Sequence, residues 1–312
     1  MLTLHRETRL AVAPPIAPPI KPRKPMRIDA HQHFWRYRSE DYPWIGTGMD
    51  LLAQDRLPYQ FQPLLEAQGL HASITVQACP GREETAFLLE MARRDKRIAG
   101  IIGWEDIARP DLAEQMERWG RAKFLGLRHQ MQDGDGPDGA SLQNRFSQGM
   151  QWLQARGYVV DVLAHERQRP ALRQFCARHD QHWLVLNHLG KPALKEFRKG
   201  RAAFERWRQE LRELTAMPHV ACKISGLLTE ADWLRGLSMR DFDHIVQCLD
   251  TALELFGPQR LMFGSDWPVC LLAASYSRVV AVVREWSATR LSAADQEALW
   301  GESSATIYDL MT

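Results

Sequence analysis

Apolar and polar residues alternate along this chain in two different patterns. From residue 27 onward, short apolar segments are separated by stretches in which apolar residues recur at intervals of three and four, as one face of a helix requires. The stretches 82–95 and 241–257 show this helical pattern, and the second ends at Gly257-Pro258, a strong helix stop signal. The short apolar segments predict eight strands, at residues 27–34, 72–78, 98–104, 124–130, 158–164, 183–190, 220–226 and 261–268.

The order of these elements defines a fold class. Nearly continuous apolar strands that alternate with helices are typical of a parallel sheet covered by helices. Eight such units predict an α/β protein with a closed (β/α)8 TIM barrel rather than an open sheet. The length of 312 residues fits one barrel domain, which we assign to residues 26–312.

Segments outside the repeating pattern have a different composition. Residues 11–25 contain six prolines, so we expect residues 1–25 to be a flexible tail in extended polyproline conformation. An alternative is that translation naturally starts at Met26, directly before the first strand. The connection 35–59 is long enough to suggest a functional loop, and 132–140 is a second, more flexible one.

Composition narrows the classes of function. The chain has 40 Lys and Arg against 38 Asp and Glu, so no net field attracts nucleic acid or an anionic membrane, and small molecules are the expected partners. Five cysteines without C-x-x-C spacing argue against a disulfide framework or a zinc ribbon and fit a reducing cytoplasm. No apolar run reaches the roughly 18 residues that a bilayer span requires. The oligomeric state stays open, with a homo-oligomer among the alternatives.

Candidate reactive groups stand where predicted strands end, which is where a barrel carries its active site. His31 and His33 are two residues apart on the first strand and therefore share one face. His188 ends the sixth apolar segment, and Asp266 ends the eighth, where a buried carboxylate requires an imidazole, a metal, an arginine or backbone amides as partner. The alternatives are packed histidines and an aspartate that caps a helix.

Other polar and aromatic residues at strand ends are candidate pocket residues. On strand four, only one of Arg128 and His129 can face the barrel axis, and we favour Arg128 because a guanidinium can polarise a carbonyl oxygen. Lys223 and Ser225 share one face at the end of strand seven. Flat aromatic rings can stack on the C–H groups of a bound small molecule, and amide or ammonium groups can bond its polar groups. On this basis the substrate-binding candidates are Trp35, Trp44, Gln77, Trp104, Lys191 and Trp267, with Tyr42 as a further hydroxyl partner.

Several motifs together resemble a known family. The segments DAHQHFW, YPWI, VQA, GWEDI, GLRHQMQD, NHLGKP, KISGLLTEA and RLMFGSDWPVC look like the amidohydrolase superfamily, in particular the amidohydrolase-2 group of sugar lactonases that includes L-fuconolactone and L-rhamnonolactone hydrolases. The match runs from about residue 26 to the C-terminus. The resemblance implies a distorted (β/α)8 barrel that opens lactones by water attack. It places the reaction centre among His31, His33, His188 and Asp266.

The resemblance also bears on the cofactor. Many superfamily members hold zinc through a Lys or Glu at strand four and a His at strand five, whereas strand four here ends in Arg128 and His129. His165, just past strand five, is the candidate for the missing ligand. Because similar lactonases work without a tightly bound metal, we expect either no metal or one weakly bound Zn²⁺. Such an ion would be held by His31, His33 and Asp266.

Lactone hydrolysis requires a nucleophilic water and stabilisation of the oxyanion on the carbonyl oxygen. We predict that Asp266 is the general base, and that His31, His33, His188 and Arg128 polarise the carbonyl. A carboxylate with a pKa near 3.9 is a weak base at neutral pH, which suits a lactone better than an amide. The alternatives are a zinc-dependent decarboxylase or another metal-dependent hydrolase of the same group and, from a different class, a non-catalytic sugar-acid binding protein.

Overall fold

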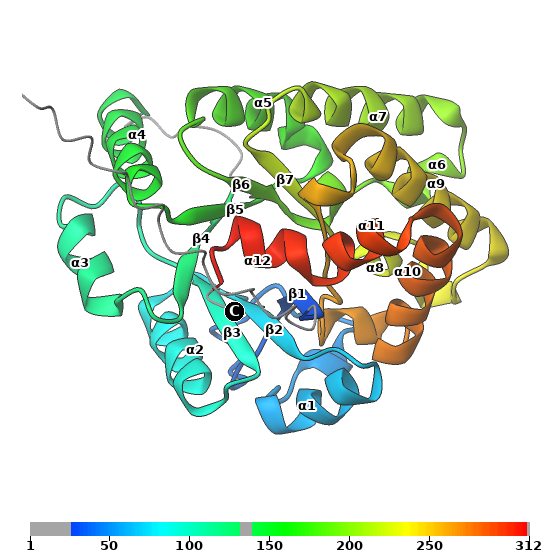
Figure 1. Ribbon diagram of the computed structural model, residues 1–312, viewed down its shortest axis with the longest axis horizontal. Coiled ribbons are helices and arrows are strands. Elements are labelled where there is room, and N and C mark those ends of the chain that lie inside the picture. Colours follow the sequence, from blue (N-terminus) through cyan, green and yellow to red (C-terminus); the bar gives the residue numbers. More distant parts are fainter. Residues whose placement is uncertain (1–25, 132–138, 311–312) are drawn as a thin grey trace, which may run out of the picture.

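The computed structural model describes residues 26–131 and 139–310, and its centre is one sheet of eight parallel strands in chain order (Figure 1). A parallel bridge between Gln32 and Trp267 joins the ends of the first and last strand, so the predicted (β/α)8 barrel is confirmed. The strands are β1 Ile28–Gln32, β2 Ala72–Val76, β3 Ile98–Gly103, β4 Phe124–Gln130, β5 Val159–Leu163, β6 Leu184–Leu186, β7 Val220–Ile224 and β8 Leu261–Phe263.

Helices surround the strands, because each buries an apolar face against the outside of the barrel (Figure 1). The two helices predicted from periodicity are present, and the second begins at a Ser238 cap that accepts from the Asp241 amide. The helices are α1 Pro58–Ala67, α2 Arg82–Arg94, α3 Leu112–Trp119, α4 Gly139–Ala155, α5 Arg169–Arg178, α6 Leu194–Phe197, α7 Arg201–Thr215, α8 Leu227–Glu230, α9 Met239–Phe256, α10 Tyr276–Arg290, α11 Ala293–Glu297 and α12 Ser303–Ile307.

Two apolar clusters lie on opposite sides of the strands. The larger one packs the helices onto the sheet. The smaller one joins alternate strand residues, such as Ile28, Val159 and Met262, to Ile307 and Tyr308 at the C-terminal end of the chain. The C-terminal segment therefore covers the apolar end of the barrel interior, and the polar strand ends lie at the other end.

The bounds predicted for the sixth and eighth strands were wrong. Both strands have only three residues, because the chain then enters turns with positive φ angles. His188 (φ 55°) and Leu189 (φ 50°) follow β6, and Asp266 (φ 61°) follows β8. Two of the five predicted catalytic residues, His188 and Asp266, are therefore on tight turns rather than on strands.

The long loop after β1 is ordered by its own aromatic residues. Trp35 bridges to Arg56 through the backbone, and its ring lies 5.5 Å from that of Tyr42 and 5.9 Å from that of Trp44, centroid to centroid. The predicted tail at residues 1–25 and most of the predicted loop 132–140 lie outside the described residues. Within the described ranges, none of the helices combines the length and the apolar character that crossing a membrane requires.

Candidate active site

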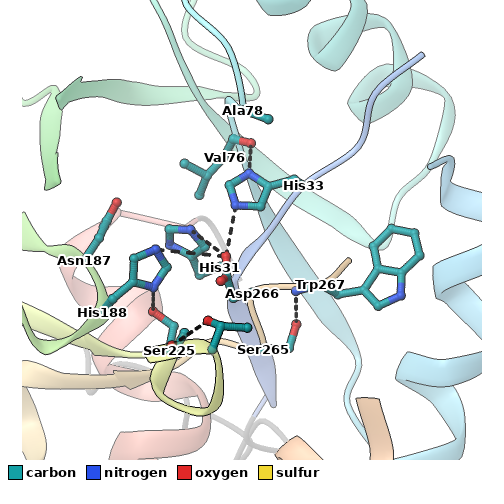
Figure 2. A network of polar contacts seen from close by, with 12 residues as sticks. His31, His33, Val76, Ala78, Asn187, His188, Ser225, Ser265, Asp266 and Trp267 are labelled. Atoms are coloured by element: carbon teal, nitrogen blue, oxygen red, sulfur yellow. Dashed lines mark hydrogen bonds and ion pairs between the residues drawn. The ribbon is translucent and has the colours of Figure 1, made fainter. Parts of the chain in front are cut away.

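Four side chains from three parts of the barrel meet around one carboxylate oxygen (Figure 2). The Oδ1 atom of Asp266 lies 3.2 Å from Nε2 of His33, 3.7 Å from Nε2 of His31 and 4.0 Å from Nε2 of His188. The His31 ring centroid lies 4.9 Å from that of His33 and 4.6 Å from that of His188. The structure thus brings together the residues that the sequence placed at three separate strand ends.

The hydrogen bonds of His33 define its tautomer. Its Nδ1 lies 2.7 Å from the carbonyl oxygen of Val76, and because a carbonyl only accepts, Nδ1 carries a hydrogen. When the ring is neutral, Nε2 therefore carries a lone pair that faces the Asp266 carboxylate. A proton or a cation between these two atoms makes the 3.2 Å contact attractive.

His188 is held by the turns after β6 and β7. Its Nδ1 lies 2.9 Å from the Ser225 hydroxyl, and its ring packs against Gly226, where a Cβ would come within 2.6 Å of Nδ1. Trp207 Nε1 donates to the carbonyl of Leu189, which fixes the next residue of the same turn. The absence of a side chain at Gly226 (φ 65°) is therefore a condition for the position of the imidazole.

Burial controls the charges in this cluster. It lowers the pKa of His31 well below its ordinary value and that of His188 to about 3, so both rings are neutral at physiological pH. Burial also acts to raise the pKa of Asp266, but the His188 and His33 imidazoles outweigh it and the pKa is lowered. At neutral pH the site therefore combines a carboxylate with the neutral imidazoles of His31 and His188.

Arg128, and not His129, lies on the site side of β4. The residue is 8% exposed, and its Nη2 donates to Oε1 of Gln77 over 3.3 Å. Its Nε has no hydrogen-bond partner among the described residues. His129 packs instead against Phe146 and Phe175, with ring centroids 4.9 and 5.4 Å away. The choice of Arg128 at strand four thus agrees with the structure, and the guanidinium retains hydrogen-bonding capacity.

The predicted substrate-binding residues separate into two groups. Trp35 is fully buried in the loop cluster and donates to the Gln54 carbonyl, and Trp267 is 1% exposed and packs against Phe34 and Phe61. Both rings are almost fully buried among their neighbours, and their assignment as substrate contacts stays a prediction. The other four stay candidates: Gln77 beside Arg128, the exposed Trp44, the half-buried Trp104, and Lys191, which pairs with Glu230.

Three polar residues of this region were not singled out from the sequence. Glu84, on α2, accepts from the amides of Ala78 and Cys79 and from the Tyr42 hydroxyl, and burial raises its pKa to about 7. Glu230, on α8, holds Lys191. Asp29, on β1, is fully buried. The sequence feature that could have identified them is a charged residue inside or next to an apolar run, because burying an unpaired charge costs free energy.

The residues present fit one divalent metal ion. One atom each from His31, His33 and Asp266 lies within 4.8 Å of the others, a set of ligands that suits Zn²⁺. Neither ring nitrogen of His31 has a hydrogen-bond partner in the described part of the chain. The Nδ1 bond of His33 to a carbonyl is the kind of contact that orients a metal-binding imidazole. His165 is exposed at the start of a 3₁₀ turn and lies outside this set.

The barrel and this His–His–Asp cluster define a hydrolase of the amidohydrolase type, and comparison with known proteins agrees. Residues 28–310 match the amidohydrolase family model, so the chain belongs to the amidohydrolase family, as the motifs predicted.

Relatives from two Burkholderia species carry one name. The chain is 59% identical over 285 residues to an L-fucono-1,5-lactonase of Burkholderia multivorans. This alignment covers 91% of this chain and 96% of that protein. It is 34% identical over 254 residues to an L-fucono-1,5-lactonase of Burkholderia ambifaria, covering 80% and 83%. A crystal structure of a Burkholderia multivorans amidohydrolase with bound zinc shares 59% identity, with a TM-score of 0.86 and coverage of 91% and 99%.

Proposed function

We propose that this protein hydrolyses a sugar lactone, with L-fucono-1,5-lactone as the first substrate to test. The observation that carries the proposal is the buried carboxylate of Asp266 beside three imidazoles, in a chain that is 59% identical to a protein named L-fucono-1,5-lactonase. Binding a sugar acid would not require an ionised carboxylate at this place, since two carboxylates repel each other. The arrangement therefore favours a catalyst over a non-catalytic binding protein.

In the proposed reaction, the oxygen of a water molecule attacks the lactone carbonyl carbon while Asp266 accepts a proton from that water. The carbonyl electron pair moves onto the oxygen, and the resulting oxyanion is stabilised by hydrogen-bond donors on His31, His188 and Arg128. When the intermediate collapses, the bond to the ring oxygen breaks and Asp266 returns the proton to that oxygen. The products are a hydroxyl group and a carboxylic acid, which ionises in water.

His33 has a different part from the one that the sequence suggested. Its Nδ1 hydrogen is used by Val76, so only Nε2 faces the reaction centre, and in the neutral ring that atom has no hydrogen to donate. We propose that His33 orients Asp266 and the attacking water and does not polarise the carbonyl.

A Zn²⁺ ion held by His31, His33 and Asp266 would polarise the carbonyl and lower the pKa of a bound water. A crystal structure of a relative that is 59% identical contains bound zinc, which supports the proposal that this protein can hold such an ion. We propose that any such ion is weakly bound, since Arg128 stands at the end of strand four, where many superfamily members have a Lys or Glu ligand. A cytoplasmic location and homo-oligomeric assembly stay predictions.

Substrate contacts are proposed for the residues that keep accessible or polar surface. Gln77 and Lys191 can bond sugar hydroxyls, and Trp44 and Trp104 can stack on the C–H faces of the ring. Lys191 lies close enough to the reaction centre for its charge to act on Asp266 and His188.

The test is a screen of aldonolactones with a pH indicator, because each ring opening releases one proton. The enzyme is assayed with and without a chelator, and its zinc content is measured. Hydrolysis of L-fucono-1,5-lactone that survives chelation supports the proposal. Inactivity toward every lactone, with zinc-dependent release of CO₂ from an aromatic acid, would identify a decarboxylase instead.

A further inference from the structure

Asp29 is a buried carboxylate that the proposed reaction does not use. It lies on β1, two residues before His31, and is 0% exposed. Its Oδ1 accepts hydrogen bonds from the backbone amides of Ser265 (2.9 Å) and His31 (3.2 Å), and its Oδ2 accepts from the Tyr276 hydroxyl (3.2 Å). One carboxylate thus joins β1, the turn after β8 and α10.

These bonds surround the residue proposed as general base. Ser265 directly precedes Asp266, and its hydroxyl accepts from the Trp267 amide over 3.0 Å on the other side. The Asp266 amide itself donates to the His31 carbonyl over 2.8 Å. The peptide groups on both sides of Asp266 are therefore tied, and the amide of Ser265 is tied to Asp29.

The backbone of Asp266 requires such support. Its φ of 61° lies in the left-handed region, which glycine adopts freely and which other residues adopt only when the surrounding structure holds them. β8 ends at Phe263, and beyond it the backbone of the turn is joined to β1 only through the isolated bridge between Gln32 and Trp267 among the described residues. The short contacts from Asp266 to the imidazoles depend on that backbone conformation.

We propose that Asp29 is a positioning residue that holds the Ser265–Asp266 turn, and with it the Asp266 carboxylate, at its distance from the three imidazoles. Hydrogen bonds from backbone amides to a carboxylate are charge-assisted and stronger than those between neutral groups. By binding the amides of both His31 and Ser265, Asp29 sets the spacing between the strand that carries the histidines and the turn that carries the base.

The test compares Asp29→Ala, Asp29→Asn and a control, Tyr308→Phe. Alanine removes the oxygen that accepts from both backbone amides, whereas asparagine keeps one side-chain oxygen that can accept from them. The control removes a buried hydroxyl that donates to Asp161 over 2.6 Å and contacts neither the turn nor the histidines. If Asp29→Ala does not fold, Asp29→Ser replaces it. The serine side chain is too short for its hydroxyl to reach both amides.

The kinetic readout rests on the proposed function. We expect Asp29→Ala to lower kcat for L-fucono-1,5-lactone by about a hundredfold, with KM within about threefold of the wild-type value, because a shift of about 1 Å in a reacting group has this effect. Asp29→Asn should recover most of the loss, and Tyr308→Phe should keep the wild-type kcat. A kcat of Asp29→Ala within about threefold of wild type would overturn the proposal.

A structural readout is independent of the activity. Crystal structures of the wild type and of Asp29→Ala should differ in the φ angle of Asp266 and in its distance to His33. An unchanged turn in the variant overturns the inference about Asp29 whatever the substrate is. Inactivity of the wild type toward lactones, with a displaced turn in the variant, would instead refute the proposed function and leave the positioning role supported.

Discussion

The barrel interior contains a buried ion pair. Substituting either member should lower the free energy of unfolding, and the loss should differ between the two members. Lys223 on β7 donates to Oδ2 of Asp161 on β5 over 2.6 Å, and both side chains are 0% exposed. Asp161 also accepts from Asn187 Nδ2 (2.9 Å, to Oδ2) and from the Tyr308 hydroxyl (2.6 Å, to Oδ1). The carboxylate therefore has three donors, whereas Asp161 is the only hydrogen-bond acceptor of the ammonium among the described residues.

The number of partners sets the magnitude of each substitution. Removing one member of a buried pair costs about 3 to 5 kcal/mol. Lys223→Met removes one of the three donors and leaves Asp161 with two, so we expect a loss near the lower end, about 3 kcal/mol. Asp161→Asn replaces an acceptor oxygen by an amide nitrogen and leaves a buried ammonium without a carboxylate, so we expect a loss near the upper end, about 5 kcal/mol.

Equilibrium unfolding in urea measures both values, if tryptophan fluorescence and far-UV circular dichroism give the same transition. The exposed pair of Arg290 and Asp250, at 3.0 Å, provides the control, and Arg290→Met should cost less than about 1 kcal/mol. The double variant Asp161→Asn/Lys223→Met should lose less than the sum of the single losses. A loss for Lys223→Met as small as that of the control, or a larger loss than for Asp161→Asn, would refute the reasoning.

Three further predictions concern the site and its surroundings. Gly226→Ala should displace the His188 ring and lower kcat by at least about tenfold; steady-state kinetics on folded protein checks this, and an unchanged kcat contradicts it. Because burial raises the pKa of Glu84 from 4.5 to about 7, its contribution to stability is complete below the unfolded pKa and is lost as the pH rises through 7. Between about pH 4 and about pH 8, the free energy of unfolding of the wild type should therefore fall by about 3 kcal/mol relative to that of Glu84→Gln. Parallel pH profiles of the two proteins would contradict this prediction. Dialysis against a chelator should leave lactone turnover unchanged while zinc content falls; turnover that is lost and then restored by Zn²⁺ would show that the metal is required.

The sequence predicted the barrel well because its strands are buried on both sides and read as short apolar runs. Periodicity located all eight strands and the helices of residues 82–95 and 241–257. It could not show that β6 and β8 end after three residues, because a left-handed turn leaves no trace in the alternation of apolar and polar residues. The positive φ angles of His188 and Asp266 are set by contacts with other parts of the chain.

The candidate site was predictable where polar residues interrupt apolar strand ends. That signal found His31, His33, His188 and Asp266, which the structure brings together. It could not show that the Trp35 ring packs within its own loop, because an aromatic residue gives no indication of which side it faces. Asp29 was missed because its partners, such as Ser265, are distant in sequence and become visible only in the folded barrel.

The central claim is that the Asp266 carboxylate acts as the base for water attack on a lactone. The most direct measurement compares kcat of the wild type and of Asp266→Asn on L-fucono-1,5-lactone, with chelator present and with folding checked by circular dichroism. Because removal of a general base typically costs a hundredfold to ten-thousandfold, the account predicts a loss in the range of about 10² to 10⁴. An Asp266→Asn enzyme that retains the wild-type kcat would contradict it.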